Sequence, residues 1–422
     1  MMTMTMTMMA ATYMIVLTTP TTIEAFQQNL PSLPRLPRLP DSLPRIPDSL
    51  PRPPTQMMPP FLQRQQQQQE EEQEQQKSTS STAPTTSQQM MAVESSNDSS
   101  QQQYFYVPSA SSLESITTTP SSAIIPSSSG WMPASSNRDS ALTRSAIDAA
   151  ADSYRGTGCL AIAKGGKLLG SSGDIDTGGR FTWSVAKSLV GTLVGALDMD
   201  VRRPASAYGF RGRRDDMSVA SFMAMNTSGS FSYSTGIVGD VASMALDAAG
   251  VRKIARTRPP GSLNRVLTEN LYNKIGMRST RAMDNGGSAI TSSCSDLLRL
   301  ALLWTRRGQW GSTTVFTQEY ARLATTSAPS NAGYGLLLYL NSAGVGEPWS
   351  HAIQRGTGPL LPNAPADTVL ALGIGGQYFL SIPSLDIAIS RLATRNCVGC
   401  QGLDAARAAW SSLLASGVLG PN

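Results

Sequence analysis

The pattern of apolar and polar positions divides the chain into two stretches of different character. Residues 1–138 consist of low-complexity tracts, whereas a regular pattern begins after them. The segment Ser140–Tyr154 carries Leu142, Ile147 and several alanines on one side of a helix. We therefore expect a folded domain over residues 139–418, preceded by a disordered region.

Strands are expected towards both ends of the folded part, with helices in the middle. Two short apolar runs, Cys159–Lys164 and Lys167–Leu169, flank Gly165-Gly166, which is a strong β-hairpin signal. Apolar spacing predicts helices in the middle and strands towards the end: helices at Leu189–Leu197, Leu263–Ile275, Ser295–Thr305, Thr317–Ala324 and Leu403–Leu414, and strands at Tyr334–Leu340, Gln377–Ile382 and Leu385–Leu392. This order favours an α+β fold, an antiparallel sheet flanked by N- and C-terminal helices plus a helical subdomain.

The first third of the chain lacks the apolar surface that a core needs. Residues 1–26 hold the apolar run Met8–Leu17, which has the length of a signal-peptide core but no basic flank, so targeting to the secretory pathway or an organelle stays open. Residues 31–60 repeat a Pro-Arg-Leu-Pro theme, which predicts polyproline II, either a stiff spacer or an arm that binds a protein partner. The Gln/Glu tract Gln65–Gln76 and the Ser/Thr-rich residues 78–136 favour disorder.

Composition excludes several classes of function. The 422 residues carry a net charge of +5 without a basic cluster interleaved with aromatic residues, so we expect no nucleic-acid partner. No apolar run reaches the roughly 18 residues of a membrane-spanning helix. The single histidine, His351, excludes multi-histidine metal sites, and we expect no metal or cofactor. We interpret His351 as a surface or structural residue.

The four cysteines are too few and too scattered for a disulfide framework or a zinc ribbon. We interpret Cys159 and Cys294, which have apolar or small neighbours, as ordinary buried thiols. Cys397 and Cys400 have the spacing of a redox motif, and a local disulfide is the alternative in an exported protein.

The candidate chemistry lies in Trp183-Ser-Val-Ala-Lys187, the one Ser-x-x-Lys motif of the chain. If Ser184 opens a helix, Lys187 lies one turn later on the same face and can reach the serine hydroxyl. Apolar neighbours disfavour the ammonium form of Lys187, which favours an amine that can act as a base. The alternative interpretation makes Ser184 a helix N-cap and Lys187 a solvated side chain.

The surrounding segments resemble, in the same order, those of the β-lactamase-related serine hydrolases. This family includes class C β-lactamases, D,D-peptidases and esterases, and the chain is most similar to its aminohexanoate-oligomer hydrolases. The similar segments are Cys159–Leu169, Trp183–Leu197, Phe231–Thr235, Leu271–Met277, Ser288–Gly311 and Leu372–Pro383. The resemblance covers about residues 140–416 and implies a β-lactamase/transpeptidase-like fold.

The resemblance also implies roles for individual residues. Ser184 would be the nucleophile that forms an acyl-enzyme, Lys187 its general base, and Tyr233 a partner in proton transfer. Thr235 matches a small polar position that touches the substrate carbonyl or Lys187.

The third motif of the family is carried by the segment that begins at Leu372. The resemblance implies that the backbone N–H groups of Ser184 and Gln377 form an oxyanion hole. Gly375 and Gly376 would let the substrate lie close to the strand.

Three features depart from the family pattern. Ile374 stands where many relatives carry Lys or His, so a charged anchor for a substrate carboxylate is missing. Only 46 positions separate Lys187 from Tyr233, and Met225–Gly229 runs into the Tyr233 motif without the usual loop. Either the site is open or the gene model lacks an exon.

Two functions follow from these features. The first is a serine hydrolase that acts on a small ester, amide or lactam through an acyl-enzyme. The second is a catalytically degenerate relative that serves as a binding or scaffold module. The intact Ser184, Lys187 and Tyr233 favour the first, and Ile374 with the shortened segment favours the second.

Overall fold

A computed structural model describes residues 124–127, 130–134, 140–155, 158–254, 257–341, 359–393 and 400–419. All of them belong to one compact unit of the chain, Gln76–Asn422. The predictions for His351, for Cys397 and for the tracts within residues 1–123 lie outside the described residues.

The centre of this unit is a six-stranded antiparallel sheet with the strand order β2-β1-β11-β10-β9-β8. Its strands are β1 (Gly158–Lys164), β2 (Lys167–Ser172), β8 (Tyr339–Leu340), β9 (Val369–Gly373), β10 (Gln377–Ile382) and β11 (Ile387–Ala393). Strands β1 and β2 form the hairpin predicted around Gly165-Gly166, and the 3₁₀ turn η5 (Pro383–Leu385) joins β10 to β11. All residues of β9, β10 and β11 are buried, because helices cover the sheet on both sides.

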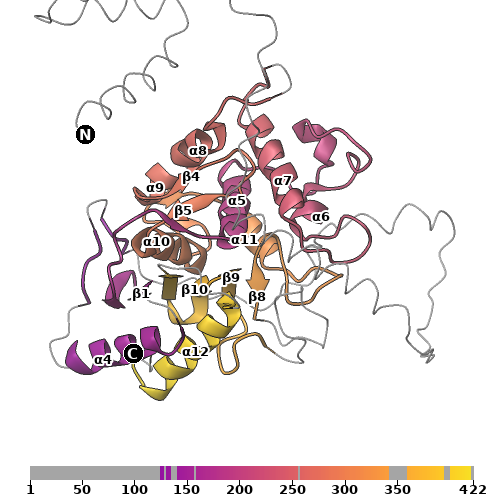
Figure 1. The fold of residues 1–422 in the computed structure, drawn as a ribbon. Coiled ribbons are helices and arrows are strands. Elements are labelled where there is room, and N and C mark those ends of the chain that lie inside the picture. The colour runs from indigo at the N-terminus through magenta and orange to yellow at the C-terminus, as the bar shows by residue number, and fades with distance from the viewer. Residues whose placement is uncertain are drawn as a thin grey trace, which may run out of the picture. The chain divides into compact units, whose positions relative to one another are not determined.

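The covering helices come from both ends of the folded part. Helices α4 (Ser140–Asp152) and α12 (Gly402–Ala415) contact each other and lie on one side of the sheet, as Figure 1 shows. Helix α10 (Cys294–Thr305) packs on β1, β10 and β11 from the other side. The predicted α+β arrangement of a sheet between terminal helices and an inserted helical part is confirmed.

The helical part surrounds helix α5 (Val185–Ala196), which is buried from Val185 to Gly195. Around it lie η3 (Ala205–Tyr208), α6 (Val219–Met223), α7 (Thr235–Ala248), α8 (Ser262–Leu267), a π-helical turn η4 (Thr268–Tyr272), α9 (Asn273–Ile275) and α11 (Gln318–Ala324). Two small sheets complete it, with the orders β3-β5-β4 (Arg180–Phe181, Ile290–Ser292, Arg281–Ala282) and β6-β7 (Gln309–Trp310, Thr313–Thr314). The predicted helix Leu263–Ile275 is therefore interrupted by a π-turn.

One predicted strand is mostly a turn. Of the segment Tyr334–Leu340, only the last two residues join the sheet as β8. Leu337 has φ +59°, in the left-handed region, and its N–H donates to the Met223 carbonyl of α6. The apolar run is buried because the turn packs against helices. A buried turn and a buried strand share the same apolar pattern, so the sequence alone does not distinguish them.

The folded part begins earlier than expected. The Trp131 indole N–H donates to Ser295 Oγ at 3.2 Å, and the guanidinium of Arg299 lies 5.5 Å from the Trp131 ring centroid. Arg299 also donates to the Ser127 carbonyl at 2.8 Å. The prediction that disorder extends to residue 138 is therefore wrong for the described residues between 124 and 134. This short segment is ordered because α10 supplies hydrogen-bond partners and Ile125 and Trp131 pack against the core.

The interpretation of Cys159 and Cys294 as thiols is also wrong, because they form a disulfide between β1 and the start of α10. Their Cα atoms lie 6.1 Å apart, although 135 positions separate them in the sequence. Only the folded arrangement brings them together, so their spacing carried no signal. Cys400 is disulfide-bonded as well.

No helix among the described residues combines the length and the apolar character needed to cross a membrane.

Candidate active site

Ser184 and Lys187 meet at the start of the buried helix α5. Ser184 occupies the N-cap position but its hydroxyl makes no capping hydrogen bond. Instead the side-chain nitrogen of Lys187 donates to Ser184 Oγ at 2.9 Å, and Lys187 is only 6% exposed. Because a buried amine needs a partner, this contact orients both groups. The alternative of a capping serine beside a solvated lysine does not describe this geometry.

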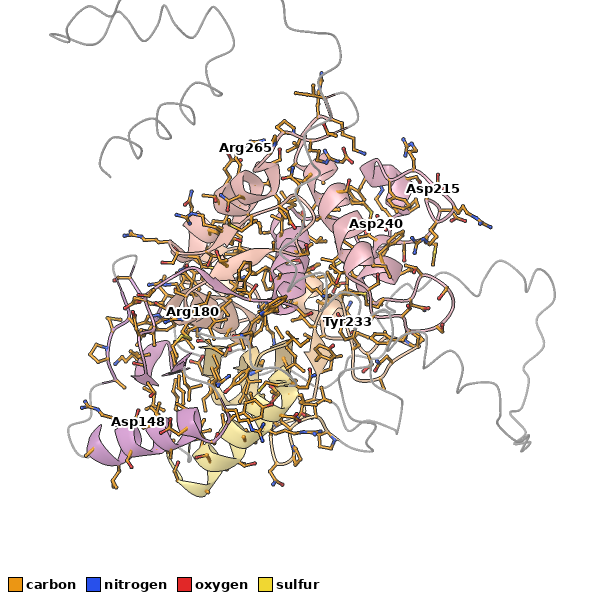
Figure 2. The ribbon with its side chains drawn as sticks, in the orientation of Figure 1. Asp148, Arg180, Asp215, Tyr233, Asp240 and Arg265 are labelled. Atoms are coloured by element: carbon orange, nitrogen blue, oxygen red, sulfur yellow. A yellow bond between two sulfur atoms is a disulfide. The ribbon has the colours of Figure 1, made fainter. Side chains whose placement is uncertain are left out.

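Tyr233 approaches the same lysine from the segment just before α7. Lys187 Nζ lies 4.7 Å from the centroid of the Tyr233 ring, so the amine contacts the face of the ring. The ring stacks on Tyr339 at 6.3 Å and meets Tyr334 edge-on at 6.3 Å. Figure 2 shows the labelled Tyr233 within the folded part, to one side of α5. Tyr233, which lies 46 positions after Lys187 in the sequence, thus contacts it in the fold.

Tyr334 was not predicted from the sequence as a site residue. It is fully buried, and its ring contacts Phe231, Tyr233 and Tyr339 with centroid distances of 5.2, 6.3 and 4.9 Å. Burial, together with the neighbouring Tyr233 phenol, raises the pKa of Tyr334 well above its ordinary value. Tyr334 therefore stays neutral, and its ring packs against the Tyr233 ring and restricts the position of that ring. An aromatic residue inside an apolar run was the only signal for it.

The end of strand β9 passes beside the Ser184 backbone. A Cβ atom added to Gly373 would lie 2.7 Å from the Thr182 carbonyl oxygen and 3.4 Å from Ser184 N. Among the described residues, β8 pairs with Val369 and Leu370 of β9, so at Gly373 the strand β9 has a partner on its β10 side but none on its β8 side. Glycine is required here because two backbones approach closely. The sequence motif had indicated the glycines two and three positions later.

Gly375 and Gly376 form the turn between β9 and β10, both with φ +81°. The Gly375 N–H donates to the Cys400 carbonyl at 2.8 Å, and a Cβ at Gly376 would collide with the Arg391 guanidinium. Gln377 is buried, pairs with Gly373 across the ladder, and its side-chain amide bonds neighbouring backbone. Gly373 thus lies next to Ser184, and the roles expected of Gly375 and Gly376 stay predictions.

A tight loop leads into Tyr233. Met225 has φ +56°, and its carbonyl accepts a hydrogen bond from Ser232 N–H at 2.8 Å. This contact joins the end of α6 to the Tyr233 segment over a short distance. Thr235 is the first residue of α7 and its side chain is exposed, without a hydrogen bond to Lys187 among the described residues.

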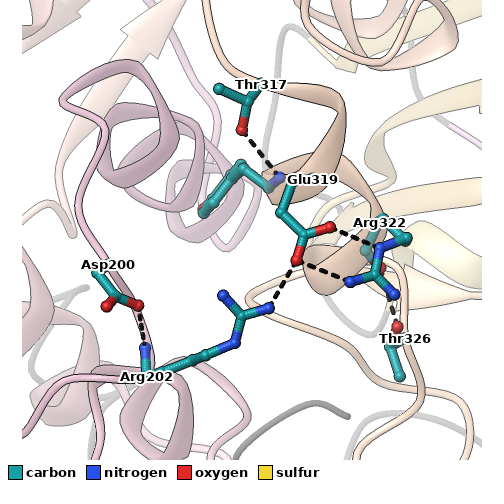
Figure 3. Close-up of polar contacts among 7 residues, drawn as sticks. Asp200, Arg202, Thr317, Glu319, Arg322 and Thr326 are labelled. Atoms are coloured by element: carbon teal, nitrogen blue, oxygen red, sulfur yellow. Dashed lines mark hydrogen bonds and ion pairs between the residues drawn. The ribbon is translucent and has the colours of Figure 1, made fainter. Parts of the chain in front are cut away.

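A separate pocket of about 220 Å³ lies at the other end of α5, between Gly195 and α11. Glu319 lines it and accepts hydrogen bonds from Arg202 at 2.6 Å and from Arg322 at 2.7 Å (Figure 3). Since helix α5 separates this pocket from Ser184, the pocket is not part of the candidate site. The described residues contain no group of three or more His, Cys, Asp or Glu able to hold a metal ion.

Comparisons with known proteins agree with the fold. No protein-family model and no curated protein matches the chain. Among solved structures, a β-lactamase from Sulfitobacter sp. EE-36 is 16% identical with a TM-score of 0.50, covering 67% of this chain and all of its own. A class C β-lactamase from Rhodobacter sphaeroides is 15% identical with a TM-score of 0.50, covering 65% of this chain and 99% of its own. SurE with D-Leu, at 15% identity and TM-score 0.50, covers 67% of this chain and 76% of its own. These likenesses confirm the fold of β-lactamase-related serine hydrolases.

Proposed function

We propose that this protein is a serine hydrolase that cleaves a small ester, amide or lactam through an acyl-enzyme on Ser184. The observation that carries the proposal is the 2.9 Å contact between Lys187 Nζ and Ser184 Oγ within a buried surrounding. A serine hydroxyl is a weak nucleophile until a neighbouring base takes its proton. The β-lactamase-related fold supports the same class of chemistry.

In the first step, neutral Lys187 accepts the Ser184 proton while Oγ bonds to the carbonyl carbon of the substrate. The carbonyl electron pair moves to oxygen and forms an oxyanion, which backbone N–H groups can stabilise. The Ser184 N–H is suited to this role, because it donates to no other described residue and faces the end of β9. The Gly375 N–H is already engaged with Cys400, so the second donor must come from another residue of the β9–β10 segment.

In the second step, the tetrahedral intermediate collapses and the bond to the leaving group breaks. The leaving group takes a proton from Lys187, with Tyr233 as the adjacent group able to share the transfer. Water then adds to the acyl carbon, and the C–O bond to Ser184 breaks as Ser184 regains its proton. This cycle needs no group beyond the three side chains, the backbone donors and water.

One observation favours the alternative, a degenerate relative that binds without catalysis. Lys187 Nζ lies over the face of the Tyr233 ring, an arrangement that favours the ammonium form. An ammonium cannot accept the serine proton. The two hypotheses therefore differ in whether Ser184 reacts as a nucleophile.

Covalent labelling of the full chain with a fluorophosphonate distinguishes them. We expect an adduct mapped to Ser184 by mass spectrometry, lost in Lys187→Ala and kept in Lys274→Ala, whose lysine is exposed on α9. Undiminished labelling of a folded Lys187→Ala variant would overturn the Ser-Lys assignment. A folded wild-type protein that takes no label would support the degenerate alternative.

A further inference from the structure

Two aromatic residues, Phe181 and Trp183, precede Ser184 in the sequence, and the proposed reaction does not use them. Phe181, at the end of β3, is 48% exposed, and its ring centroid lies 5.9 Å from that of the half-buried Trp183. The aromatic group around Tyr233, by contrast, packs against the core. A large aromatic side chain that is half open to solvent, three positions before a candidate nucleophile, offers a surface that a ligand can cover.

The backbone holds these rings in place. Trp183 has φ +50°, a left-handed conformation that a bulky residue rarely adopts. The flanking Thr182 is fully buried, and both its N–H and its hydroxyl donate to the Ile290 carbonyl of β5 at 2.9 Å. The Thr182 carbonyl in turn accepts from Val185 N–H of α5 at 3.1 Å. Unusual backbone conformations persist where surrounding bonds impose them, and they gather at functional sites.

The chemistry around Ser184 favours an uncharged ligand. Ile374, which follows the glycine beside Ser184 N, is apolar and half-buried. Among the described residues, Lys187 is the cation that contacts Ser184, and its amine is committed to the nucleophile. The surfaces offered to a substrate near the nucleophile are therefore aromatic and aliphatic, not basic.

We propose that Phe181 and Trp183 form an aromatic shelf that binds an uncharged aromatic or long aliphatic group of the substrate. The inference rests on the proposed function and narrows it: the preferred substrates are apolar esters rather than lactams that carry a carboxylate. The shelf belongs to the same peptide as Ser184, so a group that lies on it brings its carbonyl to the nucleophile.

The test compares two series of esters on the purified full chain. One series varies the acyl group of p-nitrophenyl esters from acetyl to octanoyl and phenylacetyl, and the other varies the leaving group of acetate esters from ethyl to phenyl. For Phe181→Ala we expect kcat/KM to fall about 10-fold for the large apolar members and to change less than about twofold for the smallest. Phe181→Leu should restore part of the loss, and Leu142→Ala, an exposed residue on α4, should match the wild type.

The outcomes separate the shelf from the proposed function. If Ser184 takes the fluorophosphonate but Phe181→Ala follows the wild-type profile in both series, the shelf is overturned and the hydrolase stands. A wild-type preference for a carboxylate-bearing lactam over every apolar ester would also overturn the shelf. If Ser184 takes no label on a folded chain, both proposals fail together.

Discussion

At the residue scale, Lys187 contacts two groups that favour different states of its amine. The Ser184 hydroxyl, 2.9 Å away, can lose its proton to Lys187 only when the amine is neutral. The Tyr233 ring face, 4.7 Å from Nζ, favours the ammonium. Tyr233 thus contacts Lys187 through its ring, and proton transfer by its hydroxyl is part of the proposed function.

Tyr233→Phe separates these two effects, because the ring and its packing remain while the hydroxyl is lost. If the hydroxyl shares proton transfer, the rate of acylation should fall about 100-fold or more, with little change in melting temperature. Stopped-flow acylation of Ser184 measures this rate. Tyr339→Phe, in the same aromatic group, is the control and should keep the wild-type rate. If the rate of acylation were unchanged in Tyr233→Phe, the Tyr233 hydroxyl would take no part in proton transfer and the residue would only pack.

Glu319 gives the protein a pH-dependent contact away from the site. Hydrogen bonds from Arg322 and Arg202 lower the pKa of Glu319 from 4.5 to about 2 (Figure 3). The pKa of Glu319 is lower in the folded chain than in the unfolded chain. The ionised carboxylate therefore stabilises the fold fully above pH 4.5, and this contribution is lost as the pH falls towards 2. The side chain is 48% exposed, so we expect about 1 kcal/mol or less.

Denaturant unfolding of the wild type and Glu319→Gln measures this contribution. The difference in unfolding free energy should be constant above pH 5 and should vanish near pH 2. Glu269→Gln, which removes a longer 3.5 Å pair with Arg265 on the surface, should show little difference at any pH. A Glu319→Gln difference that persisted at pH 2 would contradict the assignment.

The sequence predicted the part of the site that depends on local spacing. Ser184 and Lys187 are one helical turn apart, so their contact follows from helix geometry. The roles of Gly373 and Tyr334 could not be predicted, because they arise where β9 and the turn before β8 pack against distant elements. Thr235, Gly375, Gly376 and Gln377 keep their proposed roles only as predictions.

At the scale of elements, α5 is the axis of the helical part, and Gly195 lets α11 approach it. The Tyr320 hydroxyl of α11 donates to the Gly191 carbonyl at 2.5 Å. A Cβ at Gly195 would collide with the Tyr320 ring. Glycine inside a helix destabilises it by about 1 kcal/mol relative to alanine. In α5 this loss accompanies a closer contact with α11.

Two Gly→Ala substitutions test this exchange. Gly195→Ala should lower the unfolding free energy by about 1–3 kcal/mol despite its better helix propensity, because the Tyr320 ring cannot be displaced without losing the Gly191 contact. In Gly239→Ala, on α7, the new Cβ would have no neighbour closer than 3.9 Å. This variant should raise the unfolding free energy by about 0.5–1 kcal/mol. Denaturant unfolding compares them, and equal effects in both variants would contradict the packing argument.

Elements with a clear period were predicted well from the sequence. Strand β1 and helices α4, α10 and α12 lie within one or two residues of the expected bounds, and β2 ends three residues later than expected. The prediction for the run before β8 was wrong, because a buried turn and a buried strand share the same apolar pattern. Strand β9 and helix α7 were not predicted as elements, although the motifs beside them resemble those of the family.

At the scale of the whole molecule, the Cys159–Cys294 disulfide joins the central sheet to α10. The loop that it closes contains Ser184, Lys187 and Tyr233, so the whole proposed catalytic set lies inside it. Closing a loop of this length removes much of the freedom of the unfolded chain. The disulfide should therefore support the site from a distance.

The double variant Cys159→Ser, Cys294→Ser tests this support. The chain-entropy relation for a separation of 135 residues gives about 5 kcal/mol, and we expect a loss of about 2–5 kcal/mol in unfolding free energy. Guanidinium unfolding of the variant and the wild type without reductant measures it, with Cys400 unchanged in both. A loss below about 1 kcal/mol would show that packing alone holds β1 against α10.

The same cross-link governs which preparation of the protein can be assayed. A reducing cytosol keeps thiols reduced. Recombinant protein produced there would therefore be purified without the Cys159–Cys294 disulfide. Such material would be less stable even with Ser184 and Lys187 intact. A test of the proposed catalytic residues therefore requires protein whose free thiols have first been counted, so that formation of the disulfide is established.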